Sequence, residues 1–178
     1  MLTGPNGSGK SSLLRVMAGL TPALRGTLAW AGTNVTEDPQ AHAARLHFIG
    51  HQDALKLALT AKEVLFFWAG IRGSSPAHAR AALQRFRLDS FADWPCRFLS
   101  AGQRHRLALA RLIASPAPLW LLDEPTTGLD ESASTVLTEL IAEHRAAGGC
   151  VAIATHLTLP IADAATLPLD RYATRRTA

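Results

Sequence analysis

Near the start of the chain lies a run of glycine and small polar residues that is suited to binding phosphate. It reads Gly4-Pro5-Asn6-Gly7-Ser8-Gly9-Lys10-Ser11, which fits the pattern G-x-x-x-x-G-K-[ST]. Glycines let successive backbone N–H groups turn inward around a polyanion, where a Cβ would collide with the phosphates. Lys10 can reach the β- and γ-phosphates of a nucleotide, and the Ser11 hydroxyl can bind Mg²⁺. The run therefore predicts a phosphate-binding loop.

The residues that follow the loop have the spacing of an amphipathic helix. Apolar side chains recur between Ser12 and Leu20 at helical intervals. Such a helix would direct the positive end of its dipole at the phosphates. A glycine- and serine-rich turn that matches the pattern by chance is the alternative, and it is disfavoured because the loop opens directly into the helical pattern. A strand should feed the loop, yet only Met1-Leu2-Thr3 precede it.

A pair of adjacent carboxylates, Asp123 and Glu124, follows an apolar strand predicted at residues 119–122. In a phosphate-loop enzyme a carboxylate at this place holds Mg²⁺, directly or through water. Glu124 leaves the strand in a different direction and is placed to polarise an attacking water as a general base. His156 also ends a buried strand and could hydrogen-bond a γ-phosphate there. A solvated acidic pair and a structural histidine are the alternative interpretations.

The order of predicted elements indicates an α/β fold with a largely parallel sheet, because strands alternate with helices. Short strands are predicted at 27–30, 46–50, 119–122 and 150–154, and helices at 61–68, 76–88, 104–114 and 131–147. Residues 55–99 form a mostly helical insert, which the next helix extends to a helical subdomain of residues 55–114. We expect one domain that spans residues 1–178. Ser100 is a good N-cap for the helix that follows it.

Taken together and in order, these motifs are similar to those of the ABC-type ATPases. The matching pieces are the phosphate loop, Leu99-Ser100-Ala101-Gly102-Gln103, Leu121-Leu122-Asp123-Glu124-Pro125, Leu129-Asp130 and His156. The resemblance covers nearly the whole chain and implies a P-loop ATPase that uses ATP and Mg²⁺. It also implies a head-to-tail dimer in which each ATP lies between the loop of one subunit and residues 100–103 of the other.

The same resemblance implies a role for each residue of these motifs. Lys10, Glu124 and His156 would serve catalysis, with Glu124 as the base and His156 as the switch histidine. Ser11 would bind Mg²⁺ directly, Asp123 would hold it through water, and Asp130 would contact the partner subunit. The implied nucleotide-binding set is Gly4, Pro5, Asn6, Gly7, Ser8, Gly9, Lys10, Ser11 and Ser12, with Ser100, Ala101, Gly102 and Gln103 from the partner.

A finer resemblance points to the ATPase subunits of the cytochrome c maturation haem exporter, the CcmA family. It is carried by residues 50–56, by residues 59–61, by Ala101 in the third position of residues 99–104, and by residues 117–125. This family acts at the cytoplasmic face of the inner membrane with integral membrane permease subunits. The resemblance implies those partners and that location, and it implies contact with haem or a haem chaperone only indirectly.

The sequence departs from the wider family at two places. Most members carry a glutamine that reaches Mg²⁺ nine residues before the threonine that corresponds to Thr60. In this chain that position is His51, and Gln52 lies one place later. Either His51 replaces the glutamine, or the loop shifts by one residue and Gln52 serves; in a third interpretation neither touches the metal. The antiparallel strands that usually precede the phosphate loop, and the aromatic residue that stacks on adenine, are largely missing. We therefore expect an N-terminally truncated chain whose start was placed too late.

Composition and charge exclude some of the remaining classes of function. The net charge of +4 comes from arginines spread along the 178 residues rather than from a dense basic stripe with interleaved aromatics, so we expect no nucleic-acid partner. No apolar stretch is long enough to span a membrane, and no signal peptide opens the chain. The alternatives to a transporter subunit are an ABC ATPase with no transport role or an inactive fragment. Only 89 residues separate Lys10 from Ser100, too few for the long coiled coil of the repair-type proteins.

Overall fold

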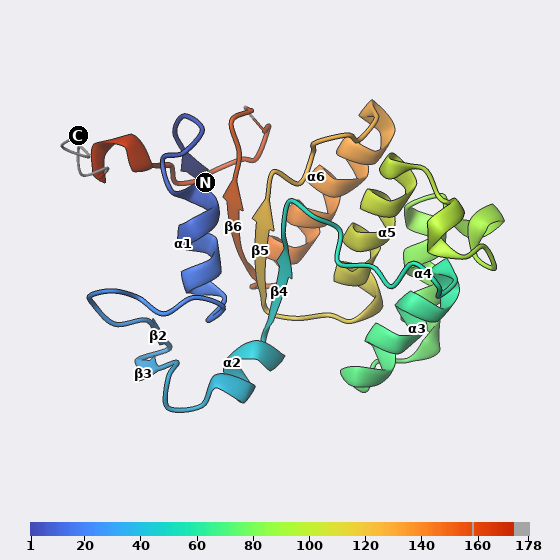
Figure 1. The fold of residues 1–178 in the computed structure, drawn as a ribbon, viewed down its shortest axis with the longest axis horizontal. Helices are drawn as coiled ribbons and strands as arrows, with labels where there is room; N and C mark the ends of the chain where they lie inside the picture. The colour runs from blue at the N-terminus through green and yellow to red at the C-terminus, as the bar shows by residue number, and fades with distance from the viewer. Residues whose placement is uncertain (158, 173–178) are drawn as a thin grey trace.

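A computed structural model describes residues 1–157 and 159–172 and has a five-stranded parallel sheet at its centre (Figure 1). The strand order is β4-β5-β6-β1-β7, and every neighbouring pair runs parallel. The strands are β1 (Leu2–Thr3), β4 (Leu46–Ile49), β5 (Leu119–Asp123), β6 (Cys150–Ala154) and β7 (Leu167–Pro168). Helices cover both faces, so the predicted α/β class is confirmed.

The side chains of β5 alternate between two apolar clusters, one on each face of the sheet. Leu119 and Leu121 belong to the cluster that contains Leu14 of helix α1 (Lys10–Met17). Trp120 and Leu122 belong to the larger cluster on the opposite face. Helices α5 (Ala101–Ala114) and α6 (Glu131–Ala146) cover that second face (Figure 1). This alternation follows from the two-residue period of a strand, in which successive side chains point to opposite faces of the sheet.

Helices α3 (Ala61–Ile71) and α4 (Pro76–Arg85) pack against α5 on the side that faces away from the sheet (Figure 1). Thr60 caps α3 through a reciprocal pair of hydrogen bonds with Glu63. Pro76 occupies the first turn of α4, where its missing N–H costs nothing. The core of these helices is continuous with the α5–α6 face of the sheet. The insert is therefore packed onto the element that carries Ser100 at its start.

Several elements differ from the sequence prediction. Helix α1 begins at Lys10 rather than Ser12 and ends at Met17, close to Gly19, whose φ is 72°. Helix α2 (Pro39–Ala44) was not predicted, although Asp38 caps it and a proline opens it. The strand predicted at 27–30 is shorter and gains a partner: β2 (Ala29–Trp30) and β3 (Thr33–Asn34) form a short antiparallel hairpin.

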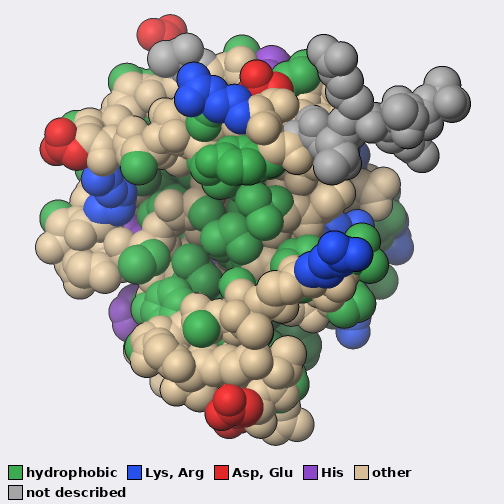
Figure 2. All heavy atoms as spheres, turned by 90° about the vertical axis from the view of Figure 1, so that its left-hand side faces the viewer, with side chains coloured by type: hydrophobic (Ala, Val, Ile, Leu, Met, Phe, Trp, Pro, Cys, Tyr) green, Lys and Arg blue, Asp and Glu red, His purple; other side chains and the backbone are tan. Residues whose placement is uncertain are grey.

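Strand β1 lies inside the sheet although it has only two residues. Leu2 is aligned with Ala154 of β6 on one side and with Leu167 of β7 on the other. The face of the molecule that carries α1 displays a group of apolar side chains (Figure 2). Leu13, Met17 and Trp30 are partly buried against the α1 cluster. Within residues 1–157 and 159–172, no helix combines the length and apolar character needed to cross a membrane.

Candidate active site

A cavity of about 430 Å³ lies where β5 and β6 end and α1 begins. This is the edge at which open parallel sheets bind their ligands. The cavity brings together residues from the two ends of the chain and from its middle. Its lining is formed by Asn6, Gly7, Gly9, Lys10, Ser11, Ser12, His51, Asp123, Glu124, Thr127 and His156.

The backbone of the phosphate loop requires glycine at its two ends. Gly4 has a φ of 140°, and a Cβ there would lie 2.8 Å from the hydroxyl of Ser8. Gly9 has a φ of 95° and directly precedes α1, so the first turn of the helix opens into the cavity. L-amino acids with side chains rarely adopt such conformations. The loop and the N-terminal end of α1 therefore lie at the cavity, and their role in binding phosphate stays a prediction.

Lys10 brings a buried positive charge into this loop. Its side chain is 6% exposed, and Nζ donates hydrogen bonds to the carbonyl oxygens of Gly4 (2.7 Å) and Pro5 (3.1 Å). No carboxylate pairs with it among the described residues. A buried ammonium without a carboxylate is unusual unless it serves an anionic ligand, because a charge removed from water must be compensated.

Ser11 and Asp123 meet at the floor of the cavity. The Ser11 hydroxyl donates to Oδ1 of Asp123 at 3.0 Å, and Asp123 is 4% exposed. One residue comes from the first turn of α1 and the other from the last position of β5. A hydroxyl and a carboxylate are hard oxygen ligands of the kind Mg²⁺ prefers. The residues present therefore fit a magnesium site that is shared between loop and strand.

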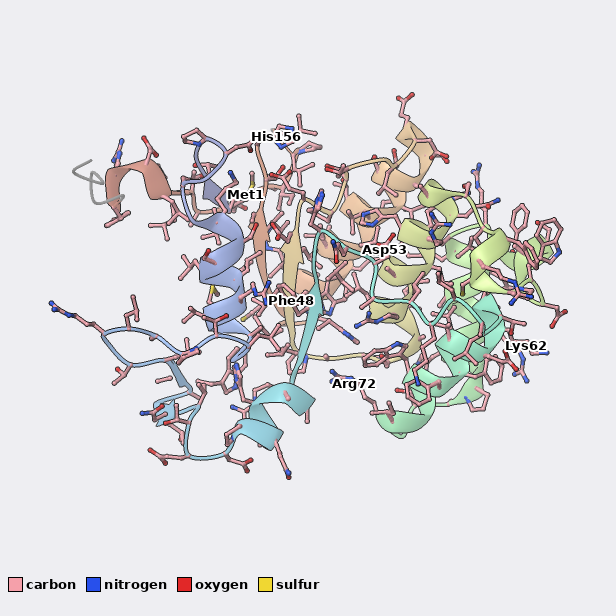
Figure 3. The ribbon with its side chains drawn as sticks, in the orientation of Figure 1. Met1, Phe48, Asp53, Lys62, Arg72 and His156 are labelled. Carbon is pink, nitrogen blue, oxygen red and sulfur yellow. The ribbon has the colours of Figure 1, made fainter. Side chains whose placement is uncertain are left out.

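Glu124 turns sharply out of the strand. Its φ is 50°, an uncommon value for a residue other than glycine, and its N–H donates to the carbonyl of Ala154. The side chain is 15% exposed, and Oε2 accepts a hydrogen bond of 2.9 Å from Nδ1 of His156. Backbone strain of this kind collects at functional sites. The two strand-end residues singled out in the sequence thus face each other at the mouth of the cavity; Figure 3 labels His156 there.

The loop after β4 places its two candidate polar residues differently. His51 lines the cavity, whereas Gln52 is exposed and does not line it. The arrangement favours His51 over Gln52 for a contact with the ligand. The assignment of either residue to Mg²⁺ stays a prediction.

Residues 100–103 lie outside the cavity, at the start of α5. Ser100 accepts a hydrogen bond from the N–H of Gln103, and the Gln103 side chain accepts one from the N–H of Ser100. This capping box starts the helix at Ala101, three residues before the predicted start at Arg104. Asp130 caps α6 in a similar way, and the N–H of Ala133 holds the pKa of its carboxyl below the usual range.

Two further groups at this site were not singled out in the sequence. Thr127 lines the cavity, and its place between the two matching pieces at residues 121–125 and 129–130 was the available signal. His105 joins Asp53 (2.7 Å) to the carbonyl oxygen of Pro125 (2.9 Å). No sequence signal links Asp53 to His105, because they lie 52 positions apart in the sequence.

Comparison with known proteins decides the family. The sequence profile described as "ABC transporter" matches residues 1–127, well over half of the chain. The chain belongs to the ABC transporter family. Two ABC proteins named "Cytochrome c biogenesis ATP-binding export protein CcmA" are each 52% identical to it, one from Rhodospirillum rubrum and one from Paramagnetospirillum magneticum. Each match covers 97% of this chain, and the matches cover 74% and 82% of the two relatives.

Solved ABC structures share the fold. An ATP-binding protein from Pyrococcus furiosus superposes with a TM-score of 0.82 over 97% of this chain and 84% of its own, at 24% identity. The dimeric ATP-binding cassette MJ0796, in a post-hydrolysis state with ADP and Pi, superposes with a TM-score of 0.78 at 27% identity, over 88% of this chain and 73% of its own. The chain is thus an ABC-type ATPase, which binds and hydrolyses ATP, and the predicted family and activity are confirmed.

Proposed function

We propose that this ATPase drives the membrane export step of cytochrome c biogenesis, as the ATP-hydrolysing subunit of a haem exporter of the CcmA type. The cavity that gathers Lys10, Ser11, Asp123, Glu124 and His156 carries the hydrolytic part of the proposal. The names of the 52% identical relatives support its place in cytochrome c biogenesis. Its partners are integral membrane permease subunits at the cytoplasmic face of the inner membrane, and haem or a haem chaperone is met only indirectly.

The phosphates of ATP bind in the loop of residues 4–11, with residues 1–178 forming one ATPase domain and residues 55–114 its helical subdomain. Lys10 releases its two loop carbonyls and donates to the β- and γ-phosphates. The N-terminus of α1, including Ser12, supplies further N–H donors. Ser11 and Asp123 would hold Mg²⁺, which would supply positive charge to neutralise the phosphates.

Glu124 acts as the general base on the attacking water. Its carboxylate stands at the cavity mouth and is mostly shielded from solvent, so an accepted proton stays near the reacting atoms. His156 holds Oε2 of Glu124 through Nδ1 and has more than half of its side chain exposed. With the γ-phosphate in place, His156 donates to that phosphate and helps to orient it against the water.

Each complete site takes residues from two subunits in a head-to-tail dimer. The cavity lining contains none of Ser100, Ala101, Gly102 or Gln103, whose capped and exposed helix start faces outward. The N-terminus of α5 offers the same kind of N–H donors as that of α1. The MJ0796 cassette with ADP and Pi is dimeric, which supports this arrangement. Asp130, at the start of α6, then contacts the partner subunit.

A groove of about 750 Å³ between the sheet and the helical insert is suited to a permease segment. Phe48 of β4, Trp68 and the half-exposed Ile71 of α3 line it, with the guanidinium groups of Arg72 and Arg111 (Figure 3 labels Phe48 and Arg72). Burial lowers the pKa of Arg111 to about 10, so the side chain stays cationic at neutral pH. Neither arginine has a carboxylate partner within the described part of the chain. The occupant we propose is a cytoplasmic permease loop that carries apolar side chains and a carboxylate.

The variant Glu124→Gln tests the hydrolytic assignment. It keeps the shape of the side chain but removes the base, so we expect ATP binding to persist and turnover to fall by roughly 10²–10⁴-fold. A nucleotide-bound dimer should then accumulate in sizing experiments with ATP and Mg²⁺. The exposed Glu139→Gln on α6 is the matched control and should hydrolyse ATP normally. Hydrolysis by Glu124→Gln at the wild-type rate would remove Glu124 from the mechanism.

A further inference from the structure

His105 connects two segments that both carry cavity residues. Its Nδ1 lies 2.7 Å from Oδ1 of Asp53, on the loop that presents His51, and Figure 3 shows Asp53 on that loop. Its Nε2 lies 2.9 Å from the carbonyl oxygen of Pro125, the residue that follows Glu124. His105 is 8% exposed and stands on α5, the helix that Ser100 caps. One imidazole therefore links three elements of the catalytic region.

Both contacts of His105 require a donor. An ionised carboxylate and a backbone carbonyl can only accept hydrogen bonds, whereas a neutral imidazole has one donor and one acceptor nitrogen. Both nitrogens therefore carry protons, and the ring is a cation beside the Asp53 carboxylate. Burial alone would lower the pKa of His105, but the bonds to Asp53 and Pro125 and the Asp53 charge raise it above its ordinary value.

A second contact shows that α5 and the segment after Glu124 are closely fitted. A Cβ on Gly102 would lie 3.2 Å from the carbonyl oxygen of Gly128, so the backbones approach directly there. Gly102 and His105 are three residues apart, which places them on the same face of the helix. The helix start thus contacts residues 125–128 at two points, and only the His105 contact extends onward to the loop of His51.

We propose that His105 is a positively charged positioning residue that holds the His51 loop and the Glu124 segment in fixed register with the start of α5. The proposal rests on the assignment of Glu124 as the base. Asp53 accepts a hydrogen bond from one ring nitrogen, and the carbonyl of Pro125 accepts one from the other. A shift of α5 would therefore move the His51 loop and the Glu124 segment together. His105 contacts neither substrate nor metal; it acts through Glu124 and His51.

The test compares two replacements of His105 in the full chain of the ATPase. His105→Gln replaces the charged ring with one neutral amide. The variant therefore cannot bind the Asp53 carboxylate and the Pro125 carbonyl as a cation does. We expect kcat to fall by roughly ten- to a hundredfold, because small displacements of catalytic groups are costly. The KM for ATP should stay within about twofold, since the phosphate loop is untouched. His105→Arg retains charge and several N–H donors, and it should restore kcat to within about threefold of wild type.

Three controls separate this role from general destabilisation. His78→Gln makes the same change on the exposed face of α4 and should leave kcat unchanged. Thermal melting identifies any loss of folding in either His105 variant. Asp53→Asn should lower kcat as His105→Gln does, and the double variant should be no worse than the single ones, because the pair acts as one unit.

The outcomes distinguish this proposal from the assignment beneath it. If Glu124→Gln abolishes turnover while His105→Gln keeps kcat within twofold of wild type, the positioning role is wrong and the base stands. Equal losses in folded His105→Arg and His105→Gln, or additive losses with Asp53→Asn, would also overturn the role of charge. If Glu124→Gln still hydrolyses ATP, the base assignment fails first, whatever His105 does.

Discussion

At the scale of single residues, several groups at the cavity owe their positions to backbone conformations with positive φ. Glu124 adopts a φ of 50°, and Gly4 and Gly9 hold conformations that a side chain would resist. Holding a residue such as Glu124 in the left-handed region costs about 1–3 kcal/mol, which the pairing of its N–H with Ala154 helps to offset. In return, Asp123 and Glu124 point to different places although they are adjacent: one to Ser11 and the other to His156.

His51 and Gln52 can be separated by mutation. Because only His51 lines the cavity, His51→Ala should slow hydrolysis severalfold and weaken its dependence on Mg²⁺. Gln52→Ala, one residue further along the same exposed loop, is the matched control and should have little effect. The measurement is the ATPase rate over a magnesium titration. The reverse ranking would place the contact at Gln52 and show that the loop shifts when nucleotide binds.

At the scale of elements, β4 depends on one buried histidine. His47 is 1% exposed, and its Nε2 donates to the carbonyl oxygen of Ser115. Burial lowers its pKa to about 3, and three cationic or titratable groups face it: Arg72 just after α3, Arg111 of α5 and His144 of α6. The ring is therefore neutral in the folded chain and can be protonated far more easily in the unfolded one.

We expect this difference to make the fold sensitive to acid. Because the folded pKa lies below the unfolded value, the stabilisation is complete above pH ~6.5 and is lost as pH falls toward 3. A single such group changes the free energy of unfolding by up to about 1.4 kcal/mol per pH unit in that window.

His47→Gln can still donate to Ser115 but does not titrate, so its unfolding free energy should fall less steeply between pH 6.5 and 4 than that of wild type. Urea unfolding at several pH values measures this slope, with exposed His78→Gln as the control. Identical slopes for His47→Gln and wild type would show that His47 does not govern acid stability.

At the scale of the whole molecule, the sequence predicted what local patterns encode. Strand β6 was predicted with its observed bounds, and the helix predicted at 61–68 starts at the observed Ala61. Ser100 was predicted as the N-cap of α5, but the predicted helix began at Arg104 rather than at Ala101. The phosphate loop and the strand-end Asp123 and Glu124 were predictable because the residues of each motif are consecutive or nearly so in the sequence.

Long-range pairings were not predictable from one sequence. Strand β7 adds only Leu167–Pro168 to the sheet, too short for a period to appear. The contact between Asp53 and His105 depends on the packing of α5 against the loop after β4, which no local pattern reports. The direct facing of Glu124 and His156 similarly requires that β5 and β6 be neighbours.

Permease docking can be tested apart from hydrolysis. Ile71→Asp puts a carboxylate into the proposed groove beside Arg72, so co-sedimentation with permease-containing membranes should fall severalfold. The ATPase rate of the detached subunit should be unchanged, because Ile71 lies outside the catalytic cavity. Leu24→Asp makes an equivalent change at a fully exposed turn outside the groove and should bind normally. Equal binding by both variants would place the docking surface elsewhere.

The central claim is that each hydrolytic site needs Lys10 of one subunit and Ser100 of the other. Lys10→Ala and Ser100→Arg should each abolish turnover alone, since either change damages both sites of a homodimer. In an equal mixture, half of the dimers are mixed and hold one intact site, so the ATPase rate should recover to roughly a quarter of wild type. Melting curves of both variants verify folding, because Ser100→Arg also removes a helix cap. A mixture no more active than its separate components would contradict the head-to-tail composite site.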